Sequence, residues 1–452
     1  MRRLVLVHLI LAPVLAGCGS DQRLDHDLEP ILLDRAPIEP GGPSTGALLA
    51  AVSTEAGVQP LLIDSAFPFN SLARAGCAVG TTPGWTYTGD MQVRDGKPPS
   101  PLRAWFHTVG LFDICPGPVG DGSIQPAGVM GGPLLSNFVV GLDLPLDPSE
   151  TAKMTLWPSF PGTDDQLGQD GQVALRFEAR GGASAGKEGG EASLTLPSAR
   201  IVLAACAAPR AFTTTDAQEV CPRGEVALRA SGQDLVLAVG TGEGPLVLSE
   251  SAWQAIAAQI GVAADAGTQG TLYTPFAAAG TPARFVDVPR LAVFQGTTDS
   301  TWLGACAELG RARRIEWVLA NQDTNLGTQP CFQPCDADGG HSVSTRSYLE
   351  LGGTLRAAVV SDASEVLRSL NSDAPPRPQV DGIIGAGTLA GTRLRLDYLL
   401  QGSNRVVASC REGSSRETCW AAPGCPGFTD SNEKKRYKCF GMADRRWAPV
   451  CE

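Results

Sequence analysis

The feature that most constrains the fold of this chain is an internal repeat. The stretch GVMGGPLLSNFVVGLDL, beginning at Gly128, aligns without a gap with GIIGAGTLAGTRLRLDY, beginning at Gly382. The identical pairs are Gly128/Gly382, Gly131/Gly385, Leu135/Leu389, Leu142/Leu396 and Asp143/Asp397. A strand-like run follows each copy, KMTLW after the first and NRVVA after the second, and each is predicted to return as a hairpin. A chain that repeats one unit in this way is expected to form two related lobes.

A second pair of segments repeats upstream. LLIDSAFPFNSL from Leu61 aligns with LAVGTGEGPLVL from Leu237, and each reads as an apolar strand, a tight turn of small residues and an apolar exit. The alignment sets Asp64 against Gly240, Ser65 against Thr241 and Ala66 against Gly242. After the second copy, Ser249 is a good N-cap, and the apolar spacing that follows predicts a helix.

Composition agrees with a folded, turn-rich chain. A chain of 452 residues is too long for one hydrophobic core of ordinary size. Its 53 Gly and 34 Pro favour many short strands over long helices. The formal net charge of -11 argues against nucleic acid as a partner, because phosphate contacts need a basic surface.

The N-terminus has the pattern of an export signal. Arg2 and Arg3 precede a short apolar run, and Leu15-Ala16-Gly17-Cys18 resembles the lipobox of bacterial lipoproteins. The resemblance implies a signal peptide over 1–17, lipidation of Cys18 and a site in the bacterial cell envelope. The outer membrane is favoured, with the body in the periplasm or at the cell surface and only the lipid in the membrane. The alternative is a secretory peptide with an incidental cysteine. Residues 18–46 are acidic and rich in Pro and Gly, which predicts a flexible tether.

The cysteines predict disulfides. Of the 13 in the chain, the 12 beyond Cys18 divide into seven in the body and five in the tail, so full pairing needs at least one bridge from tail to body. A zinc cluster is the alternative, but only three His remain after signal removal and no pair of CxxC knuckles occurs. No metal or other cofactor is expected.

The four repeated motifs resemble those of the pepsin and retropepsin type of aspartic peptidase. In that family an Asp-Ser/Thr-Gly/Ala loop follows an apolar pair, and an apolar-apolar-Gly element supports it. The resemblance implies a mainly β, bilobal pepsin-like fold. We expect an N-terminal lobe over 47–180, a C-terminal lobe with an insertion over 190–409, and a small Cys-rich tail over 410–452. It also implies that Gly131 and Gly385 support the two loops, and Tyr87 falls where the family carries a flap tyrosine, although it could equally be an ordinary strand aromatic.

The resemblance breaks at the second acid. Two carboxylates that share one proton perform the family's chemistry, but Gly240 stands where the second Asp belongs. Asp64 is therefore at most a residual catalytic residue, and it could instead cap its loop by accepting backbone N–H groups. Glu243 and Asp234 lie near Gly240 in the sequence, but their backbone positions are expected to point them the wrong way. The alternative of pairing two copies of Asp64 through dimerisation is disfavoured, because the second lobe should block that face.

The sequence therefore favours a catalytically impaired pseudopeptidase that binds an extended peptide or another ligand between its lobes, and we expect a monomer. An active aspartic endopeptidase with an unrecognised second acid is the first alternative. A structural or adhesion surface lipoprotein is the second.

Overall fold

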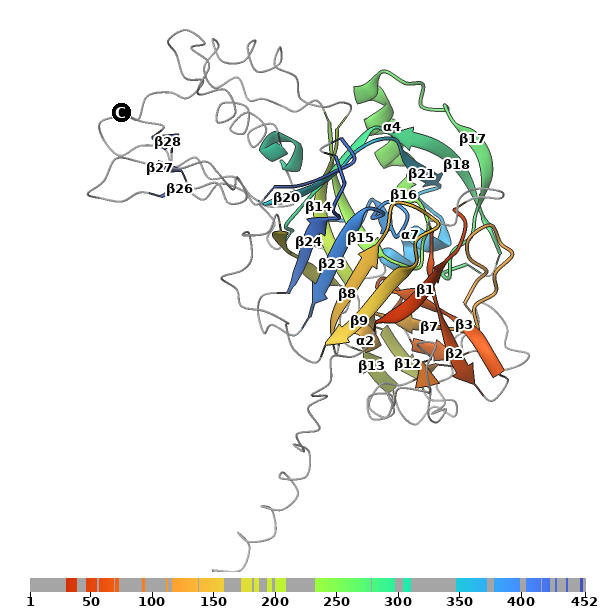
Figure 1. Cartoon of the computed structure of the whole chain (residues 1–452). Coiled ribbons are helices and arrows are strands. Elements are labelled where there is room, and N and C mark those ends of the chain that lie inside the picture. Colours follow the sequence, from red (N-terminus) through yellow and green to blue (C-terminus); the bar gives the residue numbers. More distant parts are fainter. Residues whose placement is uncertain are drawn as a thin grey trace, which may run out of the picture.

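The structure is a computed structural model, and Figure 1 shows that it is built mainly from β-strands, with few helices among the elements described. The residues that it describes are 30–38, 46–54, 57–68, 70–72, 92–93, 111–112, 116–136, 138–157, 172–180, 183–186, 193–196, 200–208, 232–277, 279–296, 304–309, 347–371, 378–398, 404–415, 417–422, 427–428, 436–437 and 448–449. Most of their strands belong to two large mixed sheets, as the predicted mainly β, pepsin-like class requires.

The first sheet joins both halves of the chain. It runs in the order β10-β24-β23-β8-β9-β1-β2-β3-β7-β4-β6, with β5 beside β2. Its strands are β1 (Ile31–Arg35), β2 (Leu48–Thr54), β3 (Gly57–Asp64), β4 (Asn70–Leu72), β5 (Gln92–Val93), β6 (Leu111–Phe112), β7 (Gly128–Gly131), β8 (Val139–Leu144), β9 (Ala152–Trp157), β10 (Gln172–Arg176), β23 (Thr392–Asp397) and β24 (Arg405–Cys410). Strands β23 and β24 come from the far end of the sequence, so the two lobes share one continuous sheet.

The repeat explains how this shared sheet is made. Strand β8 belongs to the first copy and β23 to the second, and they pair antiparallel within the sheet, where Figure 1 shows them side by side. Leu142 faces Leu394, and its equivalent Leu396 faces Val140, the equivalent of Leu394. The two copies are therefore related by an approximate twofold axis at this pair of strands. Both predicted hairpin returns are confirmed, because β9 pairs antiparallel with β8 and β24 with β23.

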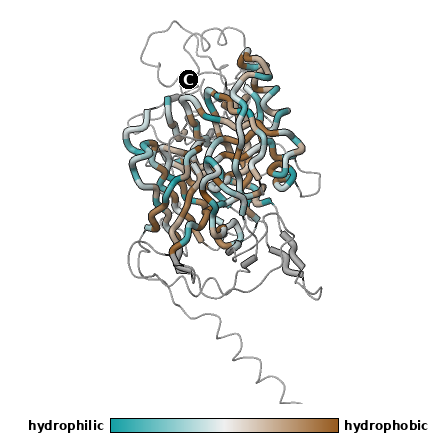
Figure 2. Tube along the Cα trace, turned by 90° about the vertical axis from the view of Figure 1, so that its right-hand side faces the viewer, coloured by the Kyte–Doolittle hydropathy of each residue, from teal (hydrophilic) through white to brown (hydrophobic). Residues whose placement is uncertain are grey.

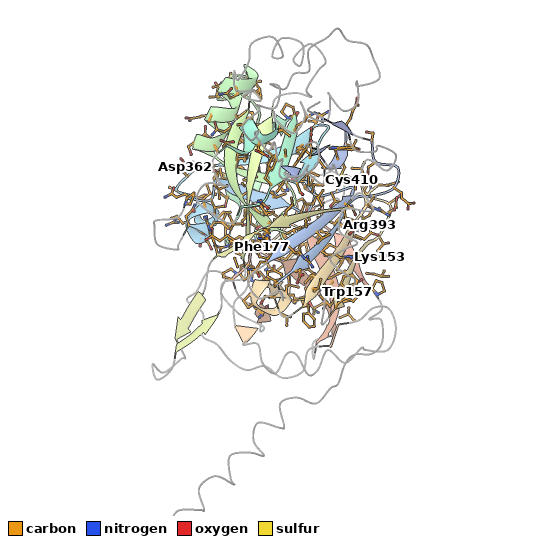
Figure 3. All side chains as sticks on the ribbon, turned by 90° about the vertical axis from the view of Figure 1, so that its left-hand side faces the viewer. Lys153, Trp157, Phe177, Asp362, Arg393 and Cys410 are labelled. Carbon is orange, nitrogen blue, oxygen red and sulfur yellow. A yellow bond between two sulfur atoms is a disulfide. The ribbon has the colours of Figure 1, made fainter. Side chains whose placement is uncertain are left out.

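Part of this sheet, at β9, has one exposed face and one buried face. In β9 the burial alternates, with Ala152, Met154 and Leu156 inside and Lys153 exposed. The labelled side chains of Lys153, Trp157 and Arg393 gather on the same side of the molecule in Figure 3. This alternation is what a half-buried antiparallel sheet requires.

The second sheet is formed by strands between residues 178 and 422. It runs β17-β18-β21-β16-β22-β15-β14-β19-β20-β25, with β11 beside β14. Its strands are β11 (Glu178–Arg180), β14 (Arg200–Ala208), β15 (Gln233–Gly240), β16 (Leu246–Ser249), β17 (Thr268–Leu272), β18 (Thr281–Val288), β19 (Arg290–Phe294), β20 (Tyr348–Leu351), β21 (Leu355–Val360), β22 (Gly382–Gly385) and β25 (Cys419–Ala422). Smaller sheets pair β12 (Ala183–Gly186) with β13 (Ser193–Leu196), and β26 (Gly427–Phe428) with β27 (Arg436–Tyr437) and β28 (Ala448–Pro449).

Three helices complete the named elements, namely α2 (Gly132–Leu135), α4 (Glu250–Ile260) and α7 (Glu365–Leu370). The predicted helix after Ser249 is confirmed as α4. Ser249 Oγ accepts the Ala252 N–H group at 3.1 Å, and Trp253 and Ile256 are buried. Apolar segments run through the interior of the trace in Figure 2, and the main cluster of buried side chains draws on both sheets.

Two boundary predictions are wrong. The tether was expected to reach residue 46, but Ile31–Arg35 form β1, which pairs with β2 and β9. The five residues are too short to signal a strand, and their partners are distant in sequence. The stretch 181–189 was assigned to neither lobe, yet it contains β12, which pairs with β13 as a hairpin.

The tail is also tied to the body. Strand β25, which lies within the predicted tail 410–452, pairs with β20 of the second lobe. The described disulfides are Cys206–Cys306 within the second lobe and Cys410–Cys419 within the tail. Neither is the predicted bridge from tail to body, whose other candidate cysteines lie outside the described residues. Among the described residues, no helix is both long enough and apolar enough to cross a membrane.

Candidate acid-pair site

The repeat places two equivalent loops. Strand β3 pairs parallel with β7 so that Asp64 lies beside Gly131, and β15 pairs parallel with β22 so that Gly240 lies beside Gly385. The next strands match as well, because Leu72 faces Gly128 in one lobe and Leu248 faces Gly382 in the other. Gly131 and Gly385 therefore lie where the support elements were expected. A side chain at Gly385 has no room, since its Cβ would lie 2.8 Å from the Glu243 carbonyl oxygen.

The two loops are bonded to each other. Ser65 Oγ donates to the Val239 carbonyl at 2.7 Å, and Thr241 Oγ1 donates to the Ile63 carbonyl at 2.8 Å. The Ser65 N–H group also donates to Thr241 Oγ1 at 3.2 Å. Both hydroxyl residues have no solvent exposure, so these bonds replace the water that the backbone groups lose. Ser65 and Thr241, which the alignment had set against each other, join the lobes.

Asp64 is enclosed and held by backbone groups. Its side chain has no solvent exposure, and Oδ1 accepts the Ala66 N–H group at 2.9 Å. Burial raises the pKa of Asp64 to about 6, and hydrogen bonds from the backbone of Ala66, Gly242 and Phe67, together with the charge of Arg200, limit that rise. Gly242 must be glycine here, because a Cβ would lie 2.7 Å from Asp64 Oδ2.

Glu243 occupies the space of the missing second acid. A Cβ added at Gly240 would overlap Glu243 Oε2, and it would also lie 2.6 Å from Ile383 Cγ2 and 3.2 Å from Ala66 Cβ. Glu243 is fully buried, and burial together with the charge of Asp64 raises its pKa well above the ordinary value. The prediction that Glu243 points the wrong way is therefore wrong. The Glu243 side chain is long enough to reach back to Gly240, and it fits there because glycine has no side chain to fill that space.

Asp234, the other nearby acid, has a structural task. Its Oδ2 accepts the Gly304 N–H group at 2.8 Å and its Oδ1 accepts the Cys306 N–H group at 2.7 Å. These bonds satisfy the first N–H groups of the helical turn at 305–309. Asp234 thus anchors the segment held by the Cys206–Cys306 disulfide, away from the acid pair.

Sequence reasoning missed two residues at the site. Asn70 Oδ1 accepts the N–H groups of Gly131 and Leu134 at 3.0 and 3.2 Å, which fixes the support element of the first lobe. Arg200, at the start of β14, is buried and donates through Nε to the Ala66 carbonyl at 3.3 Å. Its charge lowers the pKa of both Asp64 and Glu243. No local pattern marks either residue, because each reaches its partners through the fold.

Contacts between the lobes close over the loops. The Gly117 N–H group donates to the Pro275 carbonyl at 3.2 Å, and Gly120 forms an isolated bridge with Tyr273. The ring of Phe67, directly after the first loop, lies 5.3 Å from that of Phe276. With both acids fully buried, the predicted cleft is closed at this point.

Two predicted residues, the possible flap residue Tyr87 and the lipidation residue Cys18, lie outside the described residues. Within the part of the chain that the structure describes, no group of three or more His, Cys, Asp or Glu side chains is arranged to hold a metal ion. What the site does offer is a pair of buried carboxyl groups. Because two neighbouring carboxylates cannot both ionise at low cost, such a pair shares a proton, so one member can accept while the other donates.

Comparison with known proteins gives little beyond the fold. No protein-family model matches the sequence, and no curated protein matches it significantly. Among solved structures, the chain is similar to an aspartic proteinase from Irpex lacteus at 12% identity and a TM-score of 0.37, over 86% of this chain and 99% of that one. A likeness this distant carries no argument about the site. What the sheets and the repeat establish is a mainly β architecture of two related lobes, consistent with the bilobal pepsin-like fold.

Proposed function

We propose that the site between the lobes binds an extended peptide segment without cleaving it efficiently. The observation that carries this is the asymmetry of the two loops. The second loop has no acid at Gly240, and its Gly242 lies directly against the Asp64 side chain of the first loop instead of against an acid of its own. The two carboxyl groups therefore differ in origin, length and support, whereas efficient hydrolysis requires closely positioned groups.

An extended peptide is the ligand class that suits a body of this kind. Strands surround the site on both sides, and a peptide in strand conformation can pair with backbone groups while its side chains enter separate pockets. Because Asp64 and Glu243 are fully buried, a peptide can reach them only if contacts around the loops open. The protein as a whole provides both loops from one chain, so a second copy is not needed to complete the site.

Hydrogen exchange of the full chain with pools of unstructured ten-residue peptides tests this proposal. We expect a bound peptide to protect amides of 61–72 and 237–248, while 281–294 on the far part of the second sheet serves as the internal control. The peptide should be recovered intact by mass spectrometry. Protection absent from both loops, with binding elsewhere on the surface, would favour a structural or adhesion role instead.

A specific observation favours a second function, acid-dependent peptide hydrolysis. Glu243 brings a carboxyl group into the space where the second acid of a peptidase pair would begin. If Asp64 and Glu243 act together, cleavage of a denatured protein substrate should appear between about pH 3 and 7 and should disappear in both Asp64→Asn and Glu243→Gln. Cleavage that survives in both variants would point to a contaminating protease, and no cleavage in the wild type would leave binding as the function.

We also propose that a lipid on Cys18 holds the protein in the bacterial cell envelope. The support is the sequence Leu15-Ala16-Gly17-Cys18. Incorporation of labelled palmitate into the wild type but not into Cys18→Ser, with the variant released from the membrane fraction, is the expected result. Equal labelling of both would reject this anchor.

A further inference from the structure

The two carboxyl groups at the site are not equivalent in their surroundings. Asp64 Oδ1 accepts the Ala66 N–H group at 2.9 Å, and the nearby backbone N–H groups of Gly242 and Phe67 also lower the pKa of this carboxyl group. Loops from both lobes thus aim N–H donors at one acid. Hydrogen bonds donated to a carboxylate favour its ionised form.

Glu243 has the opposite environment. Neither Oε1 nor Oε2 has a hydrogen-bond partner among the described residues, and the side chain has no solvent exposure. A buried carboxylate without donors is far more costly than a buried neutral carboxyl group. The proton that the pair shares is therefore favoured on Glu243.

Arg200 adds the third charge. Its guanidinium group is buried and bonded on three sides, through Nε to the Ala66 carbonyl at 3.3 Å, Nη1 to the Leu370 carbonyl at 3.0 Å and Nη2 to the Ser369 carbonyl at 3.4 Å. The first bond attaches the cation to the loop of Asp64, and the other two attach it to the C-terminal end of α7. With one carboxylate ionised and one neutral, the three groups together carry no net charge.

We propose that the unequal supply of hydrogen-bond donors keeps Asp64 as the ionised acceptor and the proton on Glu243, and that Arg200 is the positioning residue whose charge, held at the Asp64 loop, keeps one of the two acids ionised. Among the described residues, Tyr398 also senses the charge of Asp64, and it stays neutral because burial and that negative charge raise its pKa. Asp64 Oδ2, which has no hydrogen-bond partner among the described residues, is then free to accept. Glu243 can donate.

This assignment specifies what the site should recognise, and in that respect it rests on the proposed function. A ligand needs a hydrogen-bond donor toward Asp64 and an acceptor toward Glu243. A peptide group supplies both, an N–H and a carbonyl, whereas a carboxylate or phosphate supplies only acceptors. The assignment of the proton itself does not depend on any ligand and is measured on the unliganded protein.

Infrared difference spectroscopy of the carboxyl region, from pH 4 to 9, tests the assignment. At pH 7 the wild type should show a protonated-carboxyl band that is lost in Glu243→Gln. A band that persists in Glu243→Gln but is lost in Asp64→Asn would overturn the proposal, because the proton would then be on Asp64. Both variants exchange a carboxyl group for an amide of nearly the same shape, so both are expected to fold.

The role of Arg200 is tested by its charge. In Arg200→Met the titration of Asp64 should move up by at least one pH unit, a tenfold rise in proton affinity, while Arg200→Lys should stay near the wild type. An unchanged titration in a folded Arg200→Met protein would reject the positioning role. If Arg200→Met does not fold, the Lys variant decides: a titration shifted as far as one unit with the charge retained would show that the charge does not set it.

Discussion

The two loops of the site occupy equivalent places in the two lobes, but they carry their acids at different positions. In the first, Asp64 lies at the end of β3 and accepts N–H groups from its own turn. In the second, Gly240 ends β15, and the acid is supplied three residues later by Glu243, which returns to the same space. The bonds that join the loops, through Ser65 and Thr241, are kept. The two loops thus differ in where the acid is attached to the chain, while hydroxyl groups from both loops join the lobes.

The largest effect should come from restoring the missing side chain. Gly240→Asp would force a third carboxyl group into space that Glu243 occupies, and we expect a loss of about 3 kcal/mol or more in the free energy of unfolding. Adding Glu243→Ala should recover most of that loss, because it vacates the space. Urea denaturation of the two single variants and the double variant measures the coupling. Additive losses would show that the two positions do not share one space.

The acid pair should make the protein less stable as pH rises. The folded pKa of Asp64 is raised from 3.8 to about 6, and that of Glu243 is raised well above 4.5, so the folded state binds more protons than the unfolded state above about pH 4. The stability that this binding contributes is present at pH 4 and is lost as pH rises through 6 and beyond, by roughly 2 to 3 kcal/mol.

Glu243→Gln is the matched variant for this prediction. It should unfold like the wild type at pH 4 and be more stable than the wild type at pH 7, because the amide needs no proton. Denaturation midpoints at the two pH values decide the matter. A variant that is less stable than the wild type at pH 7 would contradict the picture of a strained, unpartnered carboxyl group.

The bonds between the loops should show the next effect. Thr241→Val removes the hydroxyl that donates to the Ile63 carbonyl and accepts the Ser65 N–H group, whereas Ser65→Ala removes one bond to the Val239 carbonyl. We expect losses of about 2 and about 1 kcal/mol, because buried backbone groups are left unsatisfied. Thermal unfolding of both variants gives the order. If Ser65→Ala loses as much stability as Thr241→Val, or more, then the number of hydrogen bonds that each hydroxyl group makes does not set its contribution to stability.

The smallest effect should come from Asp143, the Asp near the end of the repeat that begins at Gly128. Asp143 is partly exposed, with its ion pairs to Arg411 at 3.1 Å and Arg393 at 3.6 Å on the outer face of the shared sheet. Its copy Asp397 is fully buried against Arg405 at 3.3 Å. Asp143→Asn should therefore cost less than about 1 kcal/mol, and Asp397→Asn clearly more. Chemical denaturation of both variants checks this, and a larger cost at Asp143 would refute it.

Much of the fold was predictable because the repeat encodes it locally. The strands of both motifs, the hairpin returns and the helix after Ser249 follow from apolar spacing and a capping residue within short windows. Strand β1 and the hairpin of β12 with β13 were missed, since one is held by distant partners and the other lies in a Gly-rich stretch that reads as a linker. The equivalence of Asp64 and Gly240 was also predictable, because the segments from Leu61 and Leu237 align without a gap.

The sequence by itself determined that two copies of one unit face each other and that the second copy lacks an acid at its turn. Only the tertiary structure decided what fills that place. The direction of the Glu243 side chain depends on the space left by Gly240, and the location of Arg200 depends on where β14 begins relative to the Asp64 loop. Both are consequences of packing between segments far apart in the chain, which no periodicity or spacing in the sequence records.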